Sequence, residues 1–351
     1  TIRYAIENGA RLILCSHLGR PKGTVKPELS LKPVAARLSQ LLGQNMSFVS
    51  DCVGPEVLLV VNNLHSGEMV LLENVRFHSE ETKNDPKFSA QLAELADVYI
   101  NDAFGTAHRA HCSTVGIAEL LKEKGAGLLM KEELENLEKA FANPRKPVVG
   151  IIGGAKVSDK ISVLKNILTK MDMVLIGGGM ANTFLKAEGL EVGISLVEND
   201  MIAIAKEIME IASARKCDFC LPKDVIVASG MDNGAEAKVT SVDKIGLKEM
   251  ALDIGPVTTR EFSGRIEKAG TIIWNGPMGV FEQAAFKKGT MEIAKAVAAS
   301  KAFSLVGGGD SVRAVIQAGV SEKISYISTG GGAFMEFLEG KALPGVVALE
   351  S

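Results

Sequence analysis

The sequence predicts an α/β protein with two domains, mainly parallel sheets and a helix that joins the domains. A chain of 351 residues is too long for one ordinary core. Short apolar runs repeatedly end in glycines and lead into helix-like segments, which is typical of strand–turn–helix units. A charged helical stretch, Met130–Ala142, precedes a sharp change in composition. We therefore place the first domain at residues 1–128, the connecting helix at residues 129–143 and the second domain at residues 144–340.

Composition excludes several classes of protein. The formal net charge is −3, which implies no general affinity for nucleic acid. No apolar run reaches transmembrane length and no signal peptide is visible, so we expect a cytoplasmic protein without a membrane partner. The five cysteines are an odd number, which favours a reducing compartment. Cys217 and Cys220 have CxxC spacing, but without a second Cys or His pair nearby we favour free thiols over a metal or redox site.

The first domain begins with the end of a helix. Ile2, Ala5 and Ile6 mark one helical face, and Asn8-Gly9 ends it. Because position 1 is Thr and only the last turns of this helix are present, we expect the sequence to start inside a larger protein. The elements that follow are predicted as strand Arg11–Ser16, helix Ser30–Leu42, strand Met69–Leu72, helix Phe88–Ala96 and strand Val98–Ile100.

Basic residues follow the strands of this first domain. His17 and Arg20 come after the first strand, Arg76 after the second and Arg109 after the third. The carboxyl ends of parallel strands meet at one edge of a sheet, so these side chains are expected to form a pocket for a small anionic substrate. All five histidines lie in this first third; we interpret His65 and His78 as surface residues, and the role of His111 stays open.

Glycine-bearing turns follow the strands of the second domain. The strands are predicted at Val148–Ile152, Met173–Ile176, Thr271–Trp274, Phe303–Val306 and Ile324–Ser328. Such turns present free backbone N–H groups at the positive end of a helix dipole, and glycine lets a phosphate approach closely. One turn is weak evidence, but several in one sheet predict a site for a poly-anionic ligand. Lys156 and Lys160 would share a helix face there, and Asp310 could cap a helix or hold a metal ion.

Two common nucleotide-binding motifs are absent. Gly177-x-Gly179 is followed by Asn182 where the dinucleotide fingerprint needs a third glycine, and no GxxxxGK[ST] motif is present. These absences disfavour a nicotinamide dehydrogenase and a P-loop enzyme. A nucleotide-binding protein without catalytic activity remains an alternative, whereas the number of glycine-bearing strand ends disfavours a purely structural role.

Eight motifs identify a family that the chain resembles. They are SHLGRP, ENVRF, DAFGTAHRA, GGAKVSDK, LIGGGMANTF, WNGPMGVFE, GGGDS and STGGGAFMEFLEG, in the order and spacing of phosphoglycerate kinases. The resemblance implies two Rossmann-like three-layer (αβα) domains joined by a hinge helix, with residues 341–351 packing back on the first domain. It further implies that the first domain binds 3-phosphoglycerate or 1,3-bisphosphoglycerate, the second binds Mg²⁺ with ADP or ATP, and domain closure brings them together in a monomer.

The resemblance also assigns roles to individual residues. Substrate-binding residues would be His17, Arg20, Arg76 and Arg109, and catalytic groups would be Lys156 with the backbone of Gly331 and Gly332. Nucleotide-binding residues would be Gly153, Gly154, Lys160, Gly177, Gly178, Asn275, Pro277, Glu282, Gly308, Gly309, Asp310 and Ser311. Asp310 would also hold magnesium through the nucleotide phosphates, and Ser311 stands where threonine is common in the family.

One departure from the family is large. The family's opening strand, with its Arg-Val/Ala-Asp-Phe-Asn-Val-Pro signature, and the catalytic arginine that follows it have no counterpart in this sequence. Arg3 lies too late to be that arginine. The alternative to an active kinase is therefore a catalytically impaired nucleotide-binding fragment of the same family. We also expect the single tryptophan, Trp274, either to report nucleotide binding or to be a core residue that does not sense it.

Overall fold

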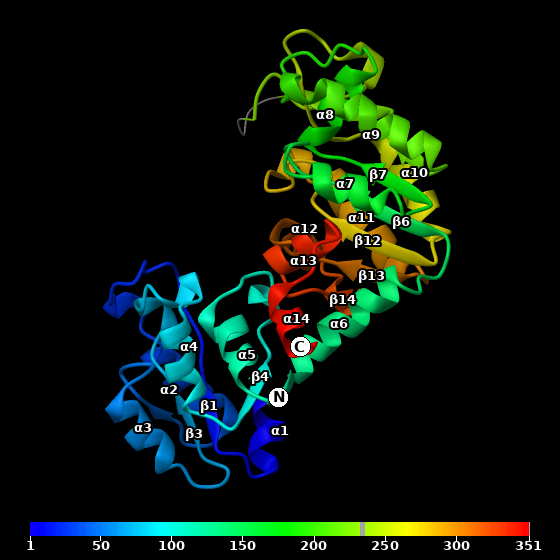
Figure 1. Cartoon of the computed structure of the whole chain (residues 1–351). Helices are drawn as coiled ribbons and strands as arrows, with labels where there is room; N and C mark the ends of the chain where they lie inside the picture. The colour runs from blue at the N-terminus through cyan, green and yellow to red at the C-terminus, as the bar shows by residue number, and fades with distance from the viewer. Residues whose placement is uncertain (232–235, 351) are drawn as a thin grey trace. The chain divides into compact units, whose positions relative to one another are not determined.

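A computed structural model describes residues 1–231 and 236–350, which form two compact units. Unit 1 comprises Thr1–Glu132 with Ala342–Ser351, and unit 2 comprises Glu133–Lys341 (Figure 1). The division falls inside α6 (Leu128–Phe141), where the sequence predicts a helix. Asp102 accepts hydrogen bonds from the first amides of α6, at 2.9 Å from Leu129 and 3.2 Å from Met130. None of the described helices is long and apolar enough to cross a membrane.

Unit 1 contains two small parallel sheets. The first has the order β1-β3-β2, formed by β1 (Leu12–Leu14), β2 (Ser47–Phe48) and β3 (Met69–Leu71), and the second pairs β4 (Val98–Asn101) with β5 (Glu123–Ala126). The helices of this unit are α1 (Ile2–Glu7), α2 (Lys32–Leu42), α3 (Pro55–Asn62), α4 (Pro86–Ala93), α5 (Ile117–Leu120) and α14 (Pro344–Glu350).

Successive residues along β3 pack on opposite faces of the first sheet. Met69 and Leu71 join a cluster with residues of α2, while Val70 joins a cluster with residues of α3 and α4. This alternation is the period of two expected for a strand that is covered on both faces. The central strand is therefore fully buried, whereas β1 and β4 keep partly exposed side chains. Among the described strands, β1 pairs only with β3 and β4 only with β5.

Unit 2 is built on a parallel sheet of six strands with the order β14-β13-β12-β6-β7-β8. These strands are β6 (Val148–Ile152), β7 (Met173–Ile176), β8 (Asp218–Cys220), β12 (Thr271–Asn275), β13 (Phe303–Val306) and β14 (Tyr326–Ile327). An antiparallel sheet of order β10-β9-β11 adjoins it, made of β9 (Asp224–Ala228), β10 (Lys238–Ser241) and β11 (Met250–Ile254). The helices are α7 (Ile161–Ile167), α8 (Gly179–Ala187), α9 (Ile202–Ala214), α10 (Pro256–Glu267), α11 (Lys288–Ala299), α12 (Gly309–Gln317) and α13 (Gly332–Leu338).

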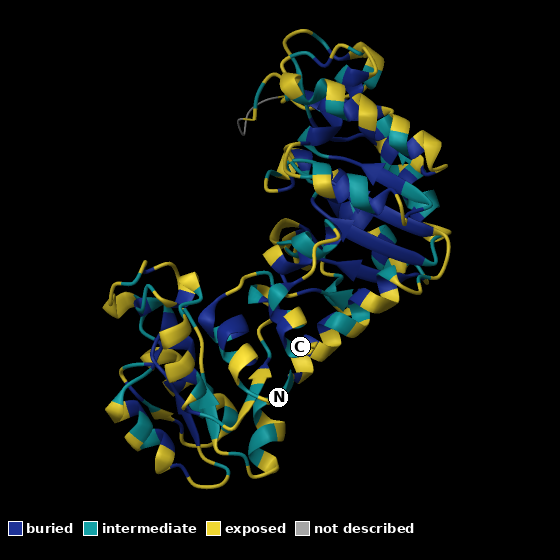
Figure 2. Cartoon of the chain, in the orientation of Figure 1, coloured by how far each residue is buried: buried dark blue, intermediate teal, exposed yellow. Residues whose placement is uncertain are grey.

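Helices cover the large sheet on both faces. One face packs on α10, α11 and α12 through a core that includes Trp274, Phe262 and Val297. On the other face, Gly150 lies against Ile167 of α7. Strands β6, β12 and β13 are buried along their whole length, and the sheet is mostly dark blue in Figure 2. The predicted α/β fold class is confirmed, and the antiparallel sheet is an addition that the sequence analysis did not predict.

Candidate functional site

The loops after β1 and β3 are joined by a buried asparagine. The amide of Asn74 donates hydrogen bonds to the carbonyl of Leu18 at 2.8 Å and to that of Leu29 at 3.0 Å. Its side-chain oxygen accepts from the Arg76 amide at 3.1 Å, and Arg76 Nη1 in turn donates to the Gly19 carbonyl at 3.2 Å. Sequence analysis did not single out Asn74, although it lies inside the ENVRF motif. This network sets the position of Arg76 relative to the loop that carries His17 and Arg20.

The basic residues predicted in unit 1 lie within electrostatic reach of one another. Burial lowers the pKa of Arg76, the charges of Arg109 and Arg20 lower it further, and the carboxylate of Glu81 opposes this shift. Burial and the charge of Arg76 lower the pKa of His17. Arg76 Nε is buried and has no hydrogen-bond partner. A group of like charges with a free buried donor is costly unless an anion binds there, so this cluster has the chemistry of an anion site.

His111 belongs to this basic cluster. Burial, followed by the charges of Arg76 and Arg109, lowers its pKa to about 4. On its other side, Nδ1 lies 3.6 Å from a carboxylate oxygen of Glu81, a buried residue that accepts hydrogen bonds from Ser113 at 2.6 and 3.0 Å. Sequence analysis left His111 undecided, yet its place two residues after Arg109 was a signal. His65 is exposed as predicted.

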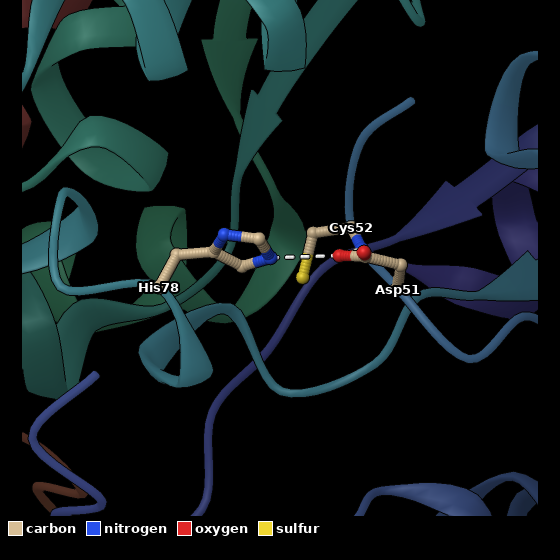
Figure 3. A group of neighbouring side chains, drawn as sticks. All are labelled: Asp51, Cys52 and His78. Carbon is tan, nitrogen blue, oxygen red and sulfur yellow. Dashed lines mark hydrogen bonds and ion pairs between the residues drawn. The ribbon is translucent and has the colours of Figure 1, made fainter. Parts of the chain in front are cut away.

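His78 is partly exposed, and it makes contacts that the sequence analysis did not predict. Its ring stacks on Phe88 with centroids 4.8 Å apart, and Nε2 lies 2.7 Å from Asp51 Oδ1 (Figure 3). The thiol of Cys52 lies beside this pair, and it donates a hydrogen bond to the Glu73 carbonyl at 3.0 Å. Burial raises the pKa of Cys52 far above its ordinary value. The thiol therefore stays protonated, and the group acts as a packed polar contact between neighbouring loops.

In unit 2 the glycine-bearing turns pack directly on one another. The Gly153 amide donates to the Asn275 carbonyl at 3.0 Å, and the Gly178 amide donates to the Met278 carbonyl at 2.9 Å. A side chain at Gly153 would collide with the Pro277 carbonyl, and one at Gly178 would collide with Gly154. These glycines are thus required for turn-to-turn packing. By contrast, nothing lies within 4 Å of a Cβ built on Gly309 or Gly331, so space for a ligand exists at these two.

One lysine links the turns through polar contacts. Lys160 Nζ donates to the side-chain oxygen of Asn275, whose amide donates to the Gly307 carbonyl at 2.7 Å. The same Nζ lies 3.5 Å from the sulfur of Met335 in α13. Burial lowers the pKa of Lys160, and the nearby Asp159 and Asp310 oppose that shift. The ends of β6, β12 and β13 and the start of α13 are therefore connected at one edge of the sheet.

Lys156 and Lys160 do not share a helix, contrary to our expectation. Residues 153–160 form a loop, and α7 begins only at Ile161, because the Gly153-Gly154 turn sends the chain across neighbouring turns first. Lys156 is exposed on this loop. The loop is held by Glu198, whose carboxylate accepts from the Ser158 amide at 3.1 Å and from its hydroxyl at 2.5 Å. No sequence signal pointed to Glu198, which is 40 residues away.

An exposed set of charges lies at the start of α12. Arg313 Nη2 donates to Asp310 at 2.8 Å and to Glu282 at 2.9 Å, so one guanidinium joins two predicted nucleotide contacts. Sequence analysis missed Arg313, although its spacing of three residues from Asp310 on a helix was visible. Ser311 is buried and its hydroxyl accepts from the Gly276 amide at 2.6 Å. A single exposed carboxylate such as Asp310 fits Mg²⁺, which is bound by one or two carboxylates together with substrate phosphates and water.

Trp274 lies next to these turns but inside the core. It is fully buried, and its indole N–H donates to the Gly276 carbonyl at 2.7 Å. Gly276 precedes Pro277, one of the predicted nucleotide contacts. The indole is therefore coupled to that turn by a hydrogen bond, and a fluorescence response to nucleotide stays a prediction.

The chain is similar to known proteins along almost its whole length. A family model described as phosphoglycerate kinase matches residues 1–341. The chain belongs to the phosphoglycerate kinase family. The phosphoglycerate kinase of Moorella thermoacetica is 58% identical over 349 residues, covering 99% of this chain and 88% of that protein. The phosphoglycerate kinase of Koribacter versatilis is 56% identical over 357 residues, covering 99% of this chain and 89% of that protein.

Solved structures of the family agree with the fold. Phosphoglycerate kinase from Coxiella burnetii matches with a TM-score of 0.93 at 44% identity, and the match covers 99% of this chain and 88% of that one. The enzyme from Pyrococcus horikoshii matches with a TM-score of 0.83 at 34% identity over the same shares. Membership in the phosphoglycerate kinase family makes this chain a phosphotransferase of the kinase class. Cys217 and Cys220 are both buried and form no disulfide.

Proposed function

We propose that this chain catalyses the reversible transfer of a phosphoryl group from 1,3-bisphosphoglycerate to Mg-ADP, giving 3-phosphoglycerate and ATP in glycolysis. The acceptor of the reverse reaction is then the carboxyl group of 3-phosphoglycerate. The observation that carries the proposal is the basic cluster of Arg76, Arg109, Arg20 and His17, in which the buried Nε of Arg76 has no hydrogen-bond partner and the nearby Glu81 carboxylate already accepts from Ser113. Few ligands other than a small polyanion offset so much confined positive charge.

In this proposal unit 1 holds the phosphoglycerate. The guanidinium groups of Arg20, Arg76 and Arg109 bind its phosphate and carboxylate oxygens, because a planar guanidinium donates two parallel hydrogen bonds to such groups. His17 and His111 are neutral near pH 7 in the free protein, since burial and the arginines lower their pKa values. A bound anion reverses part of this penalty and makes both histidines better proton donors to it.

Unit 2 holds the nucleotide in the same proposal. Turns at Gly153, Gly177 and Gly308 and the side chains of Pro277 and Glu282 surround the nucleoside and its phosphates, with Lys160 orienting Asn275. Asp310 holds magnesium through the nucleotide phosphates, and the ion would supply positive charge where the phosphate oxygens lie. Lys156 and the backbone amides of Gly331 and Gly332 stabilise the charge on the phosphoryl group during its transfer.

The reaction requires two anions to meet in line, and no protein nucleophile takes part. The residues therefore act by neutralising repulsion and aligning oxygens. We further propose that the protein acts as a monomer in the cytoplasm. Its five free cysteines, four of them buried, support a reducing compartment.

A coupled assay for ATP formation from 1,3-bisphosphoglycerate and Mg-ADP tests the proposal. Lys156→Ala and Asp310→Ala are expected to lower kcat about a hundredfold or more, while the thermal midpoint changes little because both side chains are exposed. Lys295→Ala is the matched control, an exposed lysine on α11 that pairs only with Glu292 among the described residues. Equal losses of activity and stability would count against these roles. ADP binding without any turnover would instead support the impaired fragment.

A further inference from the structure

A bulge interrupts strand β11 beside the proposed nucleotide site. Ala251 pairs with Val227 and Asp253 pairs with Ile226, so Leu252 is an extra residue without a partner in the ladder. A bulge bends its strand and redirects the neighbouring side chains and carbonyls. Here it brings the Leu252 carbonyl and the Asp253 carboxylate to the same neighbour, the segment Met278–Thr290.

These two groups hold that segment at separate points. The Val280 amide donates to the Leu252 carbonyl at 2.8 Å, and the Gly289 amide donates to Asp253 Oδ2 at 2.6 Å. Asp253 Oδ1 accepts from the Ile254 amide at 2.9 Å. A Cβ on Gly279 or Gly289 would run into Asp253, so the backbone approaches the carboxylate as closely as glycine permits. Asp253 therefore contacts both ends of the loop that follows Pro277 and contains Glu282.

We propose that Asp253 is a positioning residue for nucleotide binding: its carboxylate fixes the Met278–Thr290 segment against β11 and so sets the places of Pro277 and Glu282. This inference rests on the proposed function, because these two residues contact nucleotide only in that proposal. Asp253 itself acts through the segment and touches no substrate.

The protonation state of the Asp253 carboxylate sets how strongly it binds the Met278–Thr290 segment. Asp253 is only 4% exposed, and burial raises its pKa to about 7. The charged residues on the elements around it are Glu282, Lys287 and Lys288 on the segment and Asp224 on β9, and none of them contributes to the shift. Both oxygens of Asp253 accept amide hydrogen bonds, and a proton on either oxygen would compete with one of them. The hold therefore weakens as pH falls below about 7.

No histidine of unit 2 titrates in the same pH range as Asp253. All five histidines precede residue 112 in the sequence, so the Glu133–Lys341 stretch has none. A change in nucleotide affinity near pH 7 that arises from unit 2 then points to Asp253. The terminal phosphate of ADP also titrates in this range, but it does so equally with every variant.

The test measures the Kd of Mg-ADP by calorimetry at pH 6, 7 and 8 on the whole chain and on Asp253→Asn. Asparagine presents an NH₂ group to one of the two amide donors, so the variant mimics the protonated state at every pH. We expect its Kd to be about tenfold higher than that of the original chain at pH 8, since one buried hydrogen bond to a charged group is lost. The difference should fall to threefold or less at pH 6.

Asp224→Asn is the matched control. Asp224 is also a buried carboxylate at a helix start, where it accepts from the amides of Val257 at 2.9 Å and Thr258 at 2.7 Å. It caps α10 and contacts neither Pro277 nor Glu282 in the described interactions. We expect a lower thermal midpoint for this variant but an unchanged Kd and pH profile.

Equal Kd values for the original chain and Asp253→Asn at pH 8, or parallel pH profiles, would overturn the inference. Failure of the original chain to bind Mg-ADP would instead overturn the proposed function. If Asp253→Asn does not fold, hydrogen exchange on the unsubstituted chain tests the role of Asp253. Amide protection factors at Val280 and Gly289 should rise between pH 6 and pH 8 and rise further with Mg-ADP, and constant protection would reject the role.

Discussion

At the scale of single residues, the basic cluster of unit 1 combines charges that repel one another. Arg76 donates to the Gly19 carbonyl through Nη1, while its buried Nε has no partner among the described residues. An unsatisfied buried donor raises the energy of the free protein, and an anion that accepts from it recovers that energy. Much of the affinity for an anion is therefore expected to depend on this one side chain.

We predict that Arg76→Gln raises the Kd for 3-phosphoglycerate between about tenfold and a hundredfold, the range for losing a charged hydrogen bond. Calorimetry measures the Kd, and circular dichroism measures the thermal midpoint. Arg11→Gln serves as the control, because Arg11 is an exposed arginine of the same unit whose partner is Asp97. A similar change in Kd for both variants would indicate a diffuse charge effect in place of a site.

The lowered pKa of His111 makes the stability of the fold depend on pH. Its pKa falls from 6.5 to about 4 on folding, so between these values the unfolded chain binds more protons than the folded chain. The contribution of neutral His111 is therefore complete above about pH 6.5 and is lost as pH falls toward 4. Glu81, whose pKa burial raises, has the opposite sign and offsets part of this loss.

We expect His111→Asn to lose less stability than the original chain between pH 6.5 and pH 4.5, since asparagine does not titrate. Urea unfolding at a series of pH values measures the difference. His65→Asn is the control, because it removes an exposed histidine of the same unit. A parallel pH dependence of stability in His111→Asn and the original chain would show that the histidine is not neutral in the fold.

At the scale of elements, unit 1 differs from unit 2 in how its strands are covered. The inner strands β6, β12 and β13 of unit 2 are buried throughout, whereas β1 is half-buried and β4 exposes Val98 and Ile100. Parallel strands are normally paired and covered on both sides. The free edges of β1 and β4 therefore offer unpaired backbone groups to any extended chain.

We predict that at high concentration, above that at which the proposed monomer acts, this chain self-associates through these edges, and that Ile100→Lys reduces the association. A charged side chain on an edge strand resists pairing with another strand. Light scattering over a concentration series measures the effect. Leu59→Lys provides the control, because Leu59 is a similarly exposed apolar residue on helix α3 and offers no strand edge. If both substitutions reduced the association equally, the effect would come from higher overall solubility and not from the strand edge.

At the scale of the whole molecule, the chain divides into two compact units, each with one cluster of candidate site residues. The basic cluster lies in unit 1, and the linked glycine turns lie in unit 2. Helix α6 belongs to both, and Glu133 in its middle accepts hydrogen bonds from Ser328 at 2.9 Å and from the Thr329 amide at 2.6 Å. The end of β14 is therefore anchored to this helix.

We expect each substrate to protect its own unit from hydrogen exchange. Mg-ADP should slow exchange in the turns after β6, β7 and β12, and 3-phosphoglycerate should slow it in the loops after β1 and β3. Ligand at a hundred times its Kd stabilises the state that binds it by about 2.7 kcal/mol, which is easily detected. Mass spectrometry of peptides after exchange measures the pattern. Protection of unit 1 by Mg-ADP alone would contradict the proposed division of roles.

Sequence by itself predicted five of the six strands of the large sheet, all except β8. The predicted strands Val148–Ile152, Met173–Ile176 and Phe303–Val306 agree with β6, β7 and β13, because strands buried on both faces consist of continuous apolar residues and here end at glycines. The same signal placed Arg20 and Arg76 after the neighbouring strands β1 and β3, and Arg109 after β4, which the structure places in the second sheet of unit 1. Family motifs then identified the phosphoglycerate kinase family, because eight of them occur in one order.

Only the tertiary structure decided which residues contact the glycine-bearing turns of unit 2. Gly153 packs against the turn at Pro277, more than a hundred residues away in the sequence. Lys160 donates a hydrogen bond to Asn275, and Glu198 binds the loop that contains Lys156. Arg313 joins Asp310 to Glu282, and the bulge at Leu252 directs Asp253. Local sequence patterns report periodicity and turn chemistry over a few residues. Contacts between residues far apart in the chain depend on how sheets and loops come together, and no local pattern encodes that.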